Sequence, residues 1–293
     1  MPCSLASAEY EMNSNTKALC ALSEAKMRAA QASPPVIAAF LNSLERWRNG
    51  DNGMISEAEI DAVPTLPNLD ALNCSGELDR GLLDRLVVIK LNGGLGTGMG
   101  LEKAKSLIRV KGTETFLDLA ARQIENLRRR AGGSRPAFYL MNSFSTEADT
   151  RAALEPRWSS LKQSDGMDFR QSMAPKLELA TGRPIDWPAK PELEWCPPGH
   201  GDIYASLLGC GLLDRLLDQG VLYAFVSNSD NLGATVDFRL LKYFADSGLS
   251  FLMEAAQRTE ADRKGGHLAK RKSSGRLALR ESAQCPASDI SAF

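Results

Sequence analysis

The stretch that decides the fold is the glycine-rich run Leu91-Asn92-Gly93-Gly94-Leu95-Gly96-Thr97-Gly98-Met99-Gly100, which directly follows the apolar run Leu86-Val87-Val88-Ile89. Five of its ten residues are glycines, so the backbone can turn sharply after a buried strand and present its N–H groups to an anion. This pattern predicts a phosphate-binding loop. Taken alone, it is also compatible with an ordinary glycine-rich turn between a strand and a helix.

The loop differs from the two commonest phosphate-binding motifs. Met99-Gly100-Leu101 stands where a Walker loop has Gly-Lys-Ser or Gly-Lys-Thr, and residues 94–99 do not complete the dinucleotide-binding pattern G-x-G-x-x-G. Lys103 and Lys105 follow within reach of a bound phosphate, where an ammonium group can stabilise charge that moves onto a leaving group. The sequence therefore indicates neither a P-loop ATPase nor a dehydrogenase.

At these residues the chain resembles the UTP–glucose-1-phosphate uridylyltransferases, also called UDP-glucose pyrophosphorylases. The resemblance runs from about Leu86 to Phe293 and rests on blocks of sequence in the family's order. The blocks are Leu91–Gly100 with Lys105-Ser106, Thr115–Leu119, Gln123–Glu125, Met141–Thr146, Phe169–Gln171 with Pro175, Pro197–Tyr204, Asn228–Ala234, Lys264–Gly266 and Ala283–Pro286. The resemblance implies uridylyl transfer from UTP to glucose 1-phosphate, with UDP-glucose and pyrophosphate as products and Mg²⁺ as cofactor.

The resemblance also implies the site residues. Lys105 is the catalytic lysine, close to the Mg²⁺ without being a direct ligand, and Asp230 is the metal ligand. The nucleotide-binding residues are Leu91, Asn92, Gly93, Gly94, Lys105, Met141, Gln171 and Gly199. The substrate-binding residues are Gly93, Gly94, His200, Asn228, Ser229 and Asp230. An amide such as that of Gln171 suits the uracil edge, which needs a donor beside an acceptor. The alternatives are a structural role for His200 and a turn-capping role for Asp230.

Composition excludes several classes of protein. The chain has 293 residues, of which 43% are hydrophobic, and its formal net charge of -1 gives it no general attraction to nucleic acid. Its six cysteines form no zinc-binding spacing, which predicts reduced thiols in a cytoplasmic protein. The amino terminus lacks a basic targeting segment, and no apolar run is long enough to span a membrane.

The order of apolar runs predicts a helical lead followed by an α/β body. Short apolar strands that alternate with helices indicate a mostly parallel sheet with ligands at the strand ends. The resemblance implies a Rossmann-like, GT-A-like nucleotidyltransferase fold. We expect a helical amino-terminal segment at 1–80 and the nucleotide-binding part of the catalytic domain at 81–293. The predicted helices are Thr16–Gln31, Ile37–Trp47, Thr115–Arg130, Tyr204–Leu217 and Phe238–Asp246. The predicted strands are Leu86–Ile89, Ala137–Met141, Leu222–Val226 and Ser250–Glu254.

The resemblance further implies that family members continue past the position of Phe293, with a second catalytic lysine and a carboxyl-terminal β-helix domain. On that basis the sequence looks carboxyl-terminally truncated, and surfaces that the missing half would cover could drive self-association. The alternative function is a catalytically inactive fragment that binds nucleotide weakly or acts only by association. A uridylyltransferase for another sugar 1-phosphate, such as an N-acetylhexosamine 1-phosphate, is less favoured because its loop differs from Leu91–Gly100.

Overall fold

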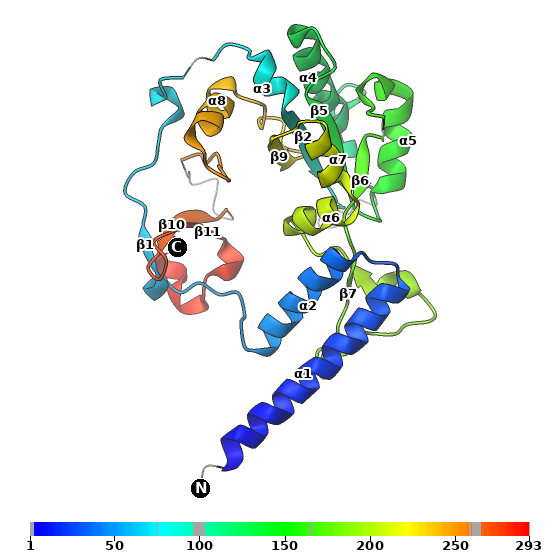
Figure 1. The fold of residues 1–293 in the computed structure, drawn as a ribbon, viewed down its shortest axis with the longest axis vertical. Coiled ribbons are helices and arrows are strands. Elements are labelled where there is room, and N and C mark those ends of the chain that lie inside the picture. Colours follow the sequence, from blue (N-terminus) through cyan, green and yellow to red (C-terminus); the bar gives the residue numbers. More distant parts are fainter. Residues whose placement is uncertain are drawn as a thin grey trace. The chain divides into compact units, whose positions relative to one another are not determined.

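The computed structural model describes residues 3–74, 76–95, 103–164, 166–257, 259 and 265–292. Its helices are α1 (Cys3–Ala29), α2 (Pro34–Arg48), α3 (Arg80–Asp84), α4 (Phe116–Ala131), α5 (Glu147–Trp158), α6 (Ile203–Gly209), α7 (Leu212–Asp218) and α8 (Phe238–Ser247). Its strands are β1 (Ile60–Ala62), β2 (Leu86–Asn92), β3 (Arg109–Lys111), β4 (Glu114–Thr115), β5 (Ala137–Asn142), β6 (Asp168–Arg170), β7 (Ala174–Pro175), β8 (Trp195–Cys196), β9 (Tyr223–Asn228), β10 (His267–Arg271) and β11 (Leu277–Arg280). Figure 1 shows these elements along the chain.

The chain forms two compact units, each made of two segments. The first unit comprises residues 1–45 and 77–237, and the second comprises residues 46–76 and 238–293. All the predicted site residues fall within the first unit. The functional division expected from the sequence, 1–80 and 81–293, stays a prediction.

A four-stranded parallel sheet forms the centre of the first unit, in the strand order β6-β5-β2-β9. Asn92 at the end of β2 is in register with Asn142 of β5, and its neighbour Leu91 is in register with Asn228 of β9. The carboxyl ends of three strands therefore meet at one edge of the sheet. This arrangement confirms the predicted α/β fold with a parallel sheet.

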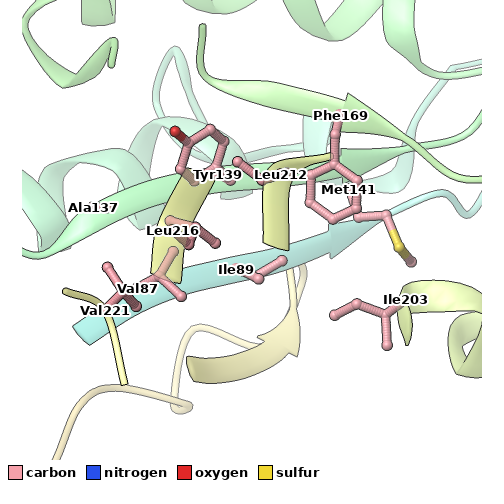
Figure 2. Close-up of a cluster of buried hydrophobic side chains, with 10 residues drawn as sticks. All are labelled: Val87, Ile89, Ala137, Tyr139, Met141, Phe169, Ile203, Leu212, Leu216 and Val221. Atoms are coloured by element: carbon pink, nitrogen blue, oxygen red, sulfur yellow. The ribbon is translucent and has the colours of Figure 1, made fainter. Parts of the chain in front are cut away.

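Alternate residues of β2 face opposite sides of the sheet, as they must in a strand. Val87 and Ile89 pack with residues of β5, β6, α6 and α7 in a buried cluster that also contains Phe169, Leu212 and Leu216. Figure 2 shows these side chains lying between the strands and α7. Lys90 and Asn92 point to the other face, where Asn92 contacts Thr150 of α5.

Helix α4 has strong local signals at both ends, which explains why it could be predicted. Thr115 is the N-cap: its hydroxyl accepts from the backbone N–H of Asp118, whose carboxylate accepts in return from the N–H of Thr115. Gly132 ends the helix in the left-handed conformation at φ 71°. Residues Leu117, Ala121 and Ile124 recur at helical spacing and are buried.

Two predictions of secondary structure were wrong. The predicted single helix Tyr204–Leu217 is two helices, α6 and α7, because Gly211 adopts φ 70° and breaks the hydrogen-bonding pattern between them. The predicted strand Ser250–Glu254 has no regular secondary structure, and the side chains of Phe251 and Met253 are exposed. An apolar run forms a strand only where a neighbouring strand pairs with its backbone, and no such pairing is found for it among the described residues.

The second unit contains an antiparallel sheet in the order β1-β10-β11. The guanidinium group of Arg280 is fully buried there and donates to the carboxylate of Glu57 at 2.6 Å. Ile55, Ile60 and Ala269 pack together beside it as a small apolar core. Over the part of the chain that the structure describes, none of the helices has the length and apolar character needed to cross a bilayer.

Candidate functional site

The side chain of Gln171 joins two of the predicted nucleotide-binding segments. Its amide Nε2 donates to the carbonyl oxygen of Gly199 at 2.5 Å, and its Oε1 lies against Gly93. Gln171 follows β6, and its own backbone N–H donates to the carbonyl oxygen of Asn142 at 2.6 Å. The predicted residues Gly93, Gln171 and Gly199, far apart in the sequence, are therefore in contact.

A second set of contacts joins the segment that contains Gln171 to the segment that contains Gly199. The carboxylate of Asp202 accepts hydrogen bonds from the backbone N–H of Ser172 at 2.8 Å and from its hydroxyl at 2.7 Å. The hydroxyl of Ser206, one turn along α6, also donates to this carboxylate at 2.6 Å. The carboxylate is thus held by three donors and sets the position of the segment that contains Gly199.

Gly199 itself occupies a backbone conformation that favours glycine, with φ 100°. A Cβ atom at this position would meet nothing within 4 Å, so open space adjoins the backbone. The next residue, His200, begins a short 3-10 helix and is exposed. The predicted contacts of Gly199 with a nucleotide base and of His200 with a sugar phosphate stay predictions.

The two ends of the glycine-rich loop are pinned together. The backbone N–H of Lys105 donates to the carbonyl oxygen of Gly94 at 3.2 Å, and Leu95 forms a bridge with Ala104. Lys105 is half-buried at the start of a 3-10 helix, whereas Lys103 is exposed. Residues 96–102, which complete the predicted phosphate-binding loop, lie outside the described residues. The described part brings Lys105 next to Gly94.

Asn92 is buried, and its side chain is occupied by the protein itself. Its amide Nδ2 donates to Oδ1 of Asn142 at 2.7 Å and to the hydroxyl of Thr150 at 2.9 Å. Its Oδ1 accepts from the hydroxyl of Ser229 at 2.9 Å, and its backbone carbonyl accepts from Oγ1 of Thr146 at 2.7 Å. The Asn92 side chain therefore ties β2 to β5, α5 and the segment after β9.

Asp230 lies in the segment after β9, and residues of β2 form hydrogen bonds with this segment on both sides of Asp230. Lys90 donates from Nζ to the hydroxyl of Ser227 at 2.8 Å and to the carbonyl oxygen of Ala234 at 2.9 Å. The backbone N–H of Ser229 donates to the carbonyl oxygen of Leu91 at 3.0 Å. Asp230 is exposed between these anchors, so its carboxylate can reach a ligand at the carboxyl edge of the sheet.

Lys90 is a buried cation with an altered ionisation. Burial away from water lowers the pKa of its ammonium group from 10.5 to about 8. The ammonium group also lies 5.8 Å from the centre of the Phe225 ring. Lys90 remains largely protonated at neutral pH, and its hydrogen bonds join two strands where the site is built.

Two predicted binding residues contribute to the core. Met141 is fully buried on β5 within the cluster of Val87, Ile89 and Phe169, as Figure 2 shows. Leu91 is half-buried and packs against the same cluster. Their predicted contacts with a nucleotide stay predictions, and the packing of both side chains is a structural role in its own right.

The sequence analysis missed several residues that hold the site together. They are Lys90, Asn142, Thr150, Asp168, Ser172 and Asp202. A usable signal existed for Lys90, because a lysine inside the otherwise apolar run of β2 must find partners when it is buried. A signal was also present for Asn142 and Asp202, which are polar residues within the family-like blocks. Thr150 and Asp168 had none.

A sequence model of a protein family matches residues 37–293, and that family is described as UTP–glucose-1-phosphate uridylyltransferase. The chain belongs to this family. A relative from Pyrus pyrifolia with the same description is 45% identical over 263 residues, which are 87% of this chain and 54% of the relative. A probable uridylyltransferase from Schizosaccharomyces pombe is 41% identical over 225 residues, which are 76% of this chain and 44% of the relative. The chain spans about half the length of the curated relatives it matches.

Solved structures of UDP-glucose pyrophosphorylases have the same fold. A point mutant of the enzyme from Leishmania major, in complex with UDP-Glc, matches with a TM-score of 0.88 and 42% identity, over 94% of this chain and 59% of that one. A protein from Trypanosoma brucei described as UDP-glucose phosphorylase matches with a TM-score of 0.86 and 43% identity, over 94% of this chain and 59% of that one. The Rossmann-like nucleotidyltransferase fold expected from the sequence is confirmed.

Proposed function

We propose that the chain is the nucleotide-binding part of an enzyme that transfers the uridylyl group of UTP to glucose 1-phosphate, giving UDP-glucose and pyrophosphate. The observation that carries the proposal is the contact of Gln171 with both Gly93 and Gly199. It joins a glycine-rich turn suited to phosphates with an amide suited to a pyrimidine edge. Family membership supplies the identity of the two substrates.

The reaction needs charge neutralisation and alignment more than it needs a protein nucleophile. An oxygen of glucose 1-phosphate attacks the α-phosphorus of UTP and pyrophosphate leaves, so two anions must approach each other in line. The backbone of Gly93 and Gly94 would cradle phosphate oxygens. The ammonium group of Lys105, whose backbone is bonded to Gly94, would stabilise the charge on the leaving group.

A divalent metal fits the residues present, and we propose Mg²⁺. Asp230 supplies one exposed carboxylate at the carboxyl edge of the sheet, and no group of three or more acidic, histidine or cysteine side chains suited to a metal is found among the described residues. Mg²⁺ is usually held by one or two carboxylates together with substrate phosphates and waters. Bound there, the metal would neutralise phosphate charge, and Lys105 would act beside it without ligating it.

The remaining sequence predictions belong to the same proposal. Free thiols are present at Cys20, Cys74, Cys196, Cys210 and Cys285, which supports a reducing compartment such as the cytoplasm. His200, Asn228 and Ser229 would contact the sugar phosphate. Self-association and the alternative of an inactive fragment stay predictions of the sequence, and binding and activity measurements separate them.

The test compares nucleotides by thermal unfolding. UTP with Mg²⁺ should raise the melting temperature of the chain, because a ligand that binds only the folded state stabilises it. ATP with Mg²⁺ should raise it much less. Nε2 of Gln171 is held by the carbonyl oxygen of Gly199, so its Oε1 remains to accept the N3–H of uracil, a donor that the ring nitrogens of adenine lack. Equal shifts for UTP and ATP would remove the proposed uracil site. No shift with either nucleotide would favour the inactive fragment.

A further inference from the structure

A pocket with a volume of about 440 Å³ lies between helices α1 and α2 on one side and β7 and α6 on the other. All the described residues that line it belong to the first unit. Pockets that bind small organic molecules measure roughly 300–1,000 Å³. The volume is therefore sufficient for a ligand that contains one ring.

The pocket has a buried inner end and an open mouth. Met27 of α1 and Val36 of α2 line it and are buried, and they belong to the small apolar core between these two helices. Ala39, Gly201 and Tyr204 also line the pocket and are exposed. The pocket therefore extends from the protein surface to this apolar core.

Most of the pocket wall is apolar. Phe40, Met173 and Pro198 contribute apolar side chains to it, and the flexible thioether of Met173 can adapt to the shape of a ligand. Removing apolar surface from water is favourable. Such a wall therefore suits a hydrocarbon ring.

Asp202 is the one charged residue among the described residues of the pocket wall. Its carboxylate accepts hydrogen bonds from the backbone N–H and the hydroxyl of Ser172 and from the hydroxyl of Ser206, and all three donors are neutral. Lys26 of α1 forms its ion pair with Glu194 instead. An ionised carboxylate offers about four acceptor sites, so Asp202 keeps one acceptor site and an uncompensated negative charge.

We propose that this pocket binds a small organic cation. The apolar ring of the ligand packs between α2 and α6, and its ammonium group donates to the carboxylate of Asp202. A charge-assisted hydrogen bond of this kind is stronger than a neutral one, so the positive charge selects the ligand. The inference goes beyond the proposed function, because Gly93 and Gln171 of the proposed uracil site are not among the residues that line the pocket.

The first experiment compares two ligands of the same shape. 2-Phenylethylammonium carries a ring and one ammonium group, whereas 2-phenylethanol has a neutral hydroxyl in place of the ammonium group. In ¹H–¹⁵N spectra of the full chain, the amide signals of Phe40, Met173 and Ala205 should move in a saturable way as 2-phenylethylammonium is added. 2-Phenylethanol should bind at least about fivefold more weakly, because it lacks the charge.

Two results of this comparison would overturn the proposal. Unmoved signals with 2-phenylethylammonium would mean that the pocket does not take a cation of this size. Equal dissociation constants for the two ligands would make the pocket a purely apolar site. The ligand is varied instead of Asp202, because replacing Asp202 would also break its hydrogen bonds with Ser172.

The second experiment tests where the ligand binds. Ala39→Phe places a larger side chain on the pocket wall and should weaken 2-phenylethylammonium at least about tenfold. Ala38→Phe is the matched control, because Ala38 is exposed on the same helix and is not among the lining residues; it should change the dissociation constant by less than about twofold. Unchanged binding in Ala39→Phe would place the ligand elsewhere. If Ala39→Phe does not fold, Ser43→Leu at another exposed lining position of α2 carries the same comparison.

A third titration separates the inference from the proposed function. Saturating UDP with Mg²⁺ should leave 2-phenylethylammonium bound to the unaltered chain, since the two ligands occupy different residues. Displacement by UDP would place the cation in the nucleotide site and overturn the inference. If the unaltered chain does not bind UDP, the proposed function fails, while the first two experiments still decide whether the pocket binds a cation.

Discussion

Oε1 of Gln171 lies 2.6 Å from the position that a Cβ atom of residue 93 would occupy, so Gly93 and Gln171 fit together only because residue 93 has no side chain. Gln171 cannot easily move aside, because it is buried and its Nε2 is bonded to the carbonyl oxygen of Gly199. Glycine at position 93 is therefore required by packing as well as by the expected approach of a phosphate.

Gly93→Ala should lower the free energy of unfolding by about 1–3 kcal/mol, the usual cost of adding a methyl group to a well-packed place. The adjacent Gly94→Ala is the matched control, because a Cβ atom there would meet nothing within 4 Å. Its effect should be neutral or slightly stabilising, since alanine restricts the unfolded chain. Urea unfolding of both variants measures the difference, and equal stabilities would show that Gln171 adapts freely.

The parts of this fold that local sequence determines could be predicted. The apolar runs of β2 and β5 and the capped helix α4 were expected from their own residues, and the structure confirms them. Gly93, Gln171 and Gly199 were predicted to bind one nucleotide, but their contact with one another was not predicted. Their direct contact depends on how β6 pairs with β5, which no local pattern reveals.

Register explains what the sequence could not predict. Asn92, Asn142 and Asp168 meet because three strands pair with a particular offset, and a shift of one residue would turn each side chain to the opposite face. The same limit applies to the wrongly predicted strand Ser250–Glu254, whose composition suits a strand. What it lacks is a pairing neighbour among the described residues.

The buried ammonium group of Lys90 should give stability a specific dependence on pH. Its folded-state pKa of about 8 is lower than the 10.5 of an exposed lysine, so between these values the unfolded chain binds more protons. The contribution of Lys90 to the free energy of unfolding must then rise as the pH increases from 8 to 10.5, by about 3 kcal/mol at most.

The measurement is urea unfolding of the unaltered chain and of Lys90→Met at several pH values from 7 to 10.5. Other lysines and tyrosines titrate in both proteins, so the difference between the two free energies isolates residue 90. Above pH 8, the free energy of unfolding of the unaltered chain should rise relative to that of Lys90→Met. Two curves that stay parallel over this range would mean that Lys90 keeps an ordinary pKa.

Replacing the proposed metal ligand should separate binding from folding. Asp230→Asn retains the shape of an exposed side chain and loses its charge, so the free energy of unfolding should change by less than about 0.5 kcal/mol. The Mg²⁺ concentration needed for half-maximal UTP binding should rise at least about tenfold, because an amide is a far weaker ligand for a hard cation. Asp218→Asn, an exposed residue at the end of α7, should leave the Mg²⁺ titration unchanged. An unaltered titration for Asp230→Asn would make Asp230 a turn residue.

The last prediction concerns the two lysines that follow the glycine-rich loop. Lys105 is half-buried and its backbone is bonded to Gly94, whereas Lys103 is exposed. In an assay of pyrophosphate release from UTP and glucose 1-phosphate, Lys105→Ala should lower kcat by about a hundredfold or more, as expected when a group that stabilises transition-state charge is removed. Lys103→Ala should lower it by less than about threefold, since a solvated charge interacts weakly with the bound phosphates. If the two variants lose activity equally, general positive charge near the loop, and not the placement of Lys105, supports the reaction.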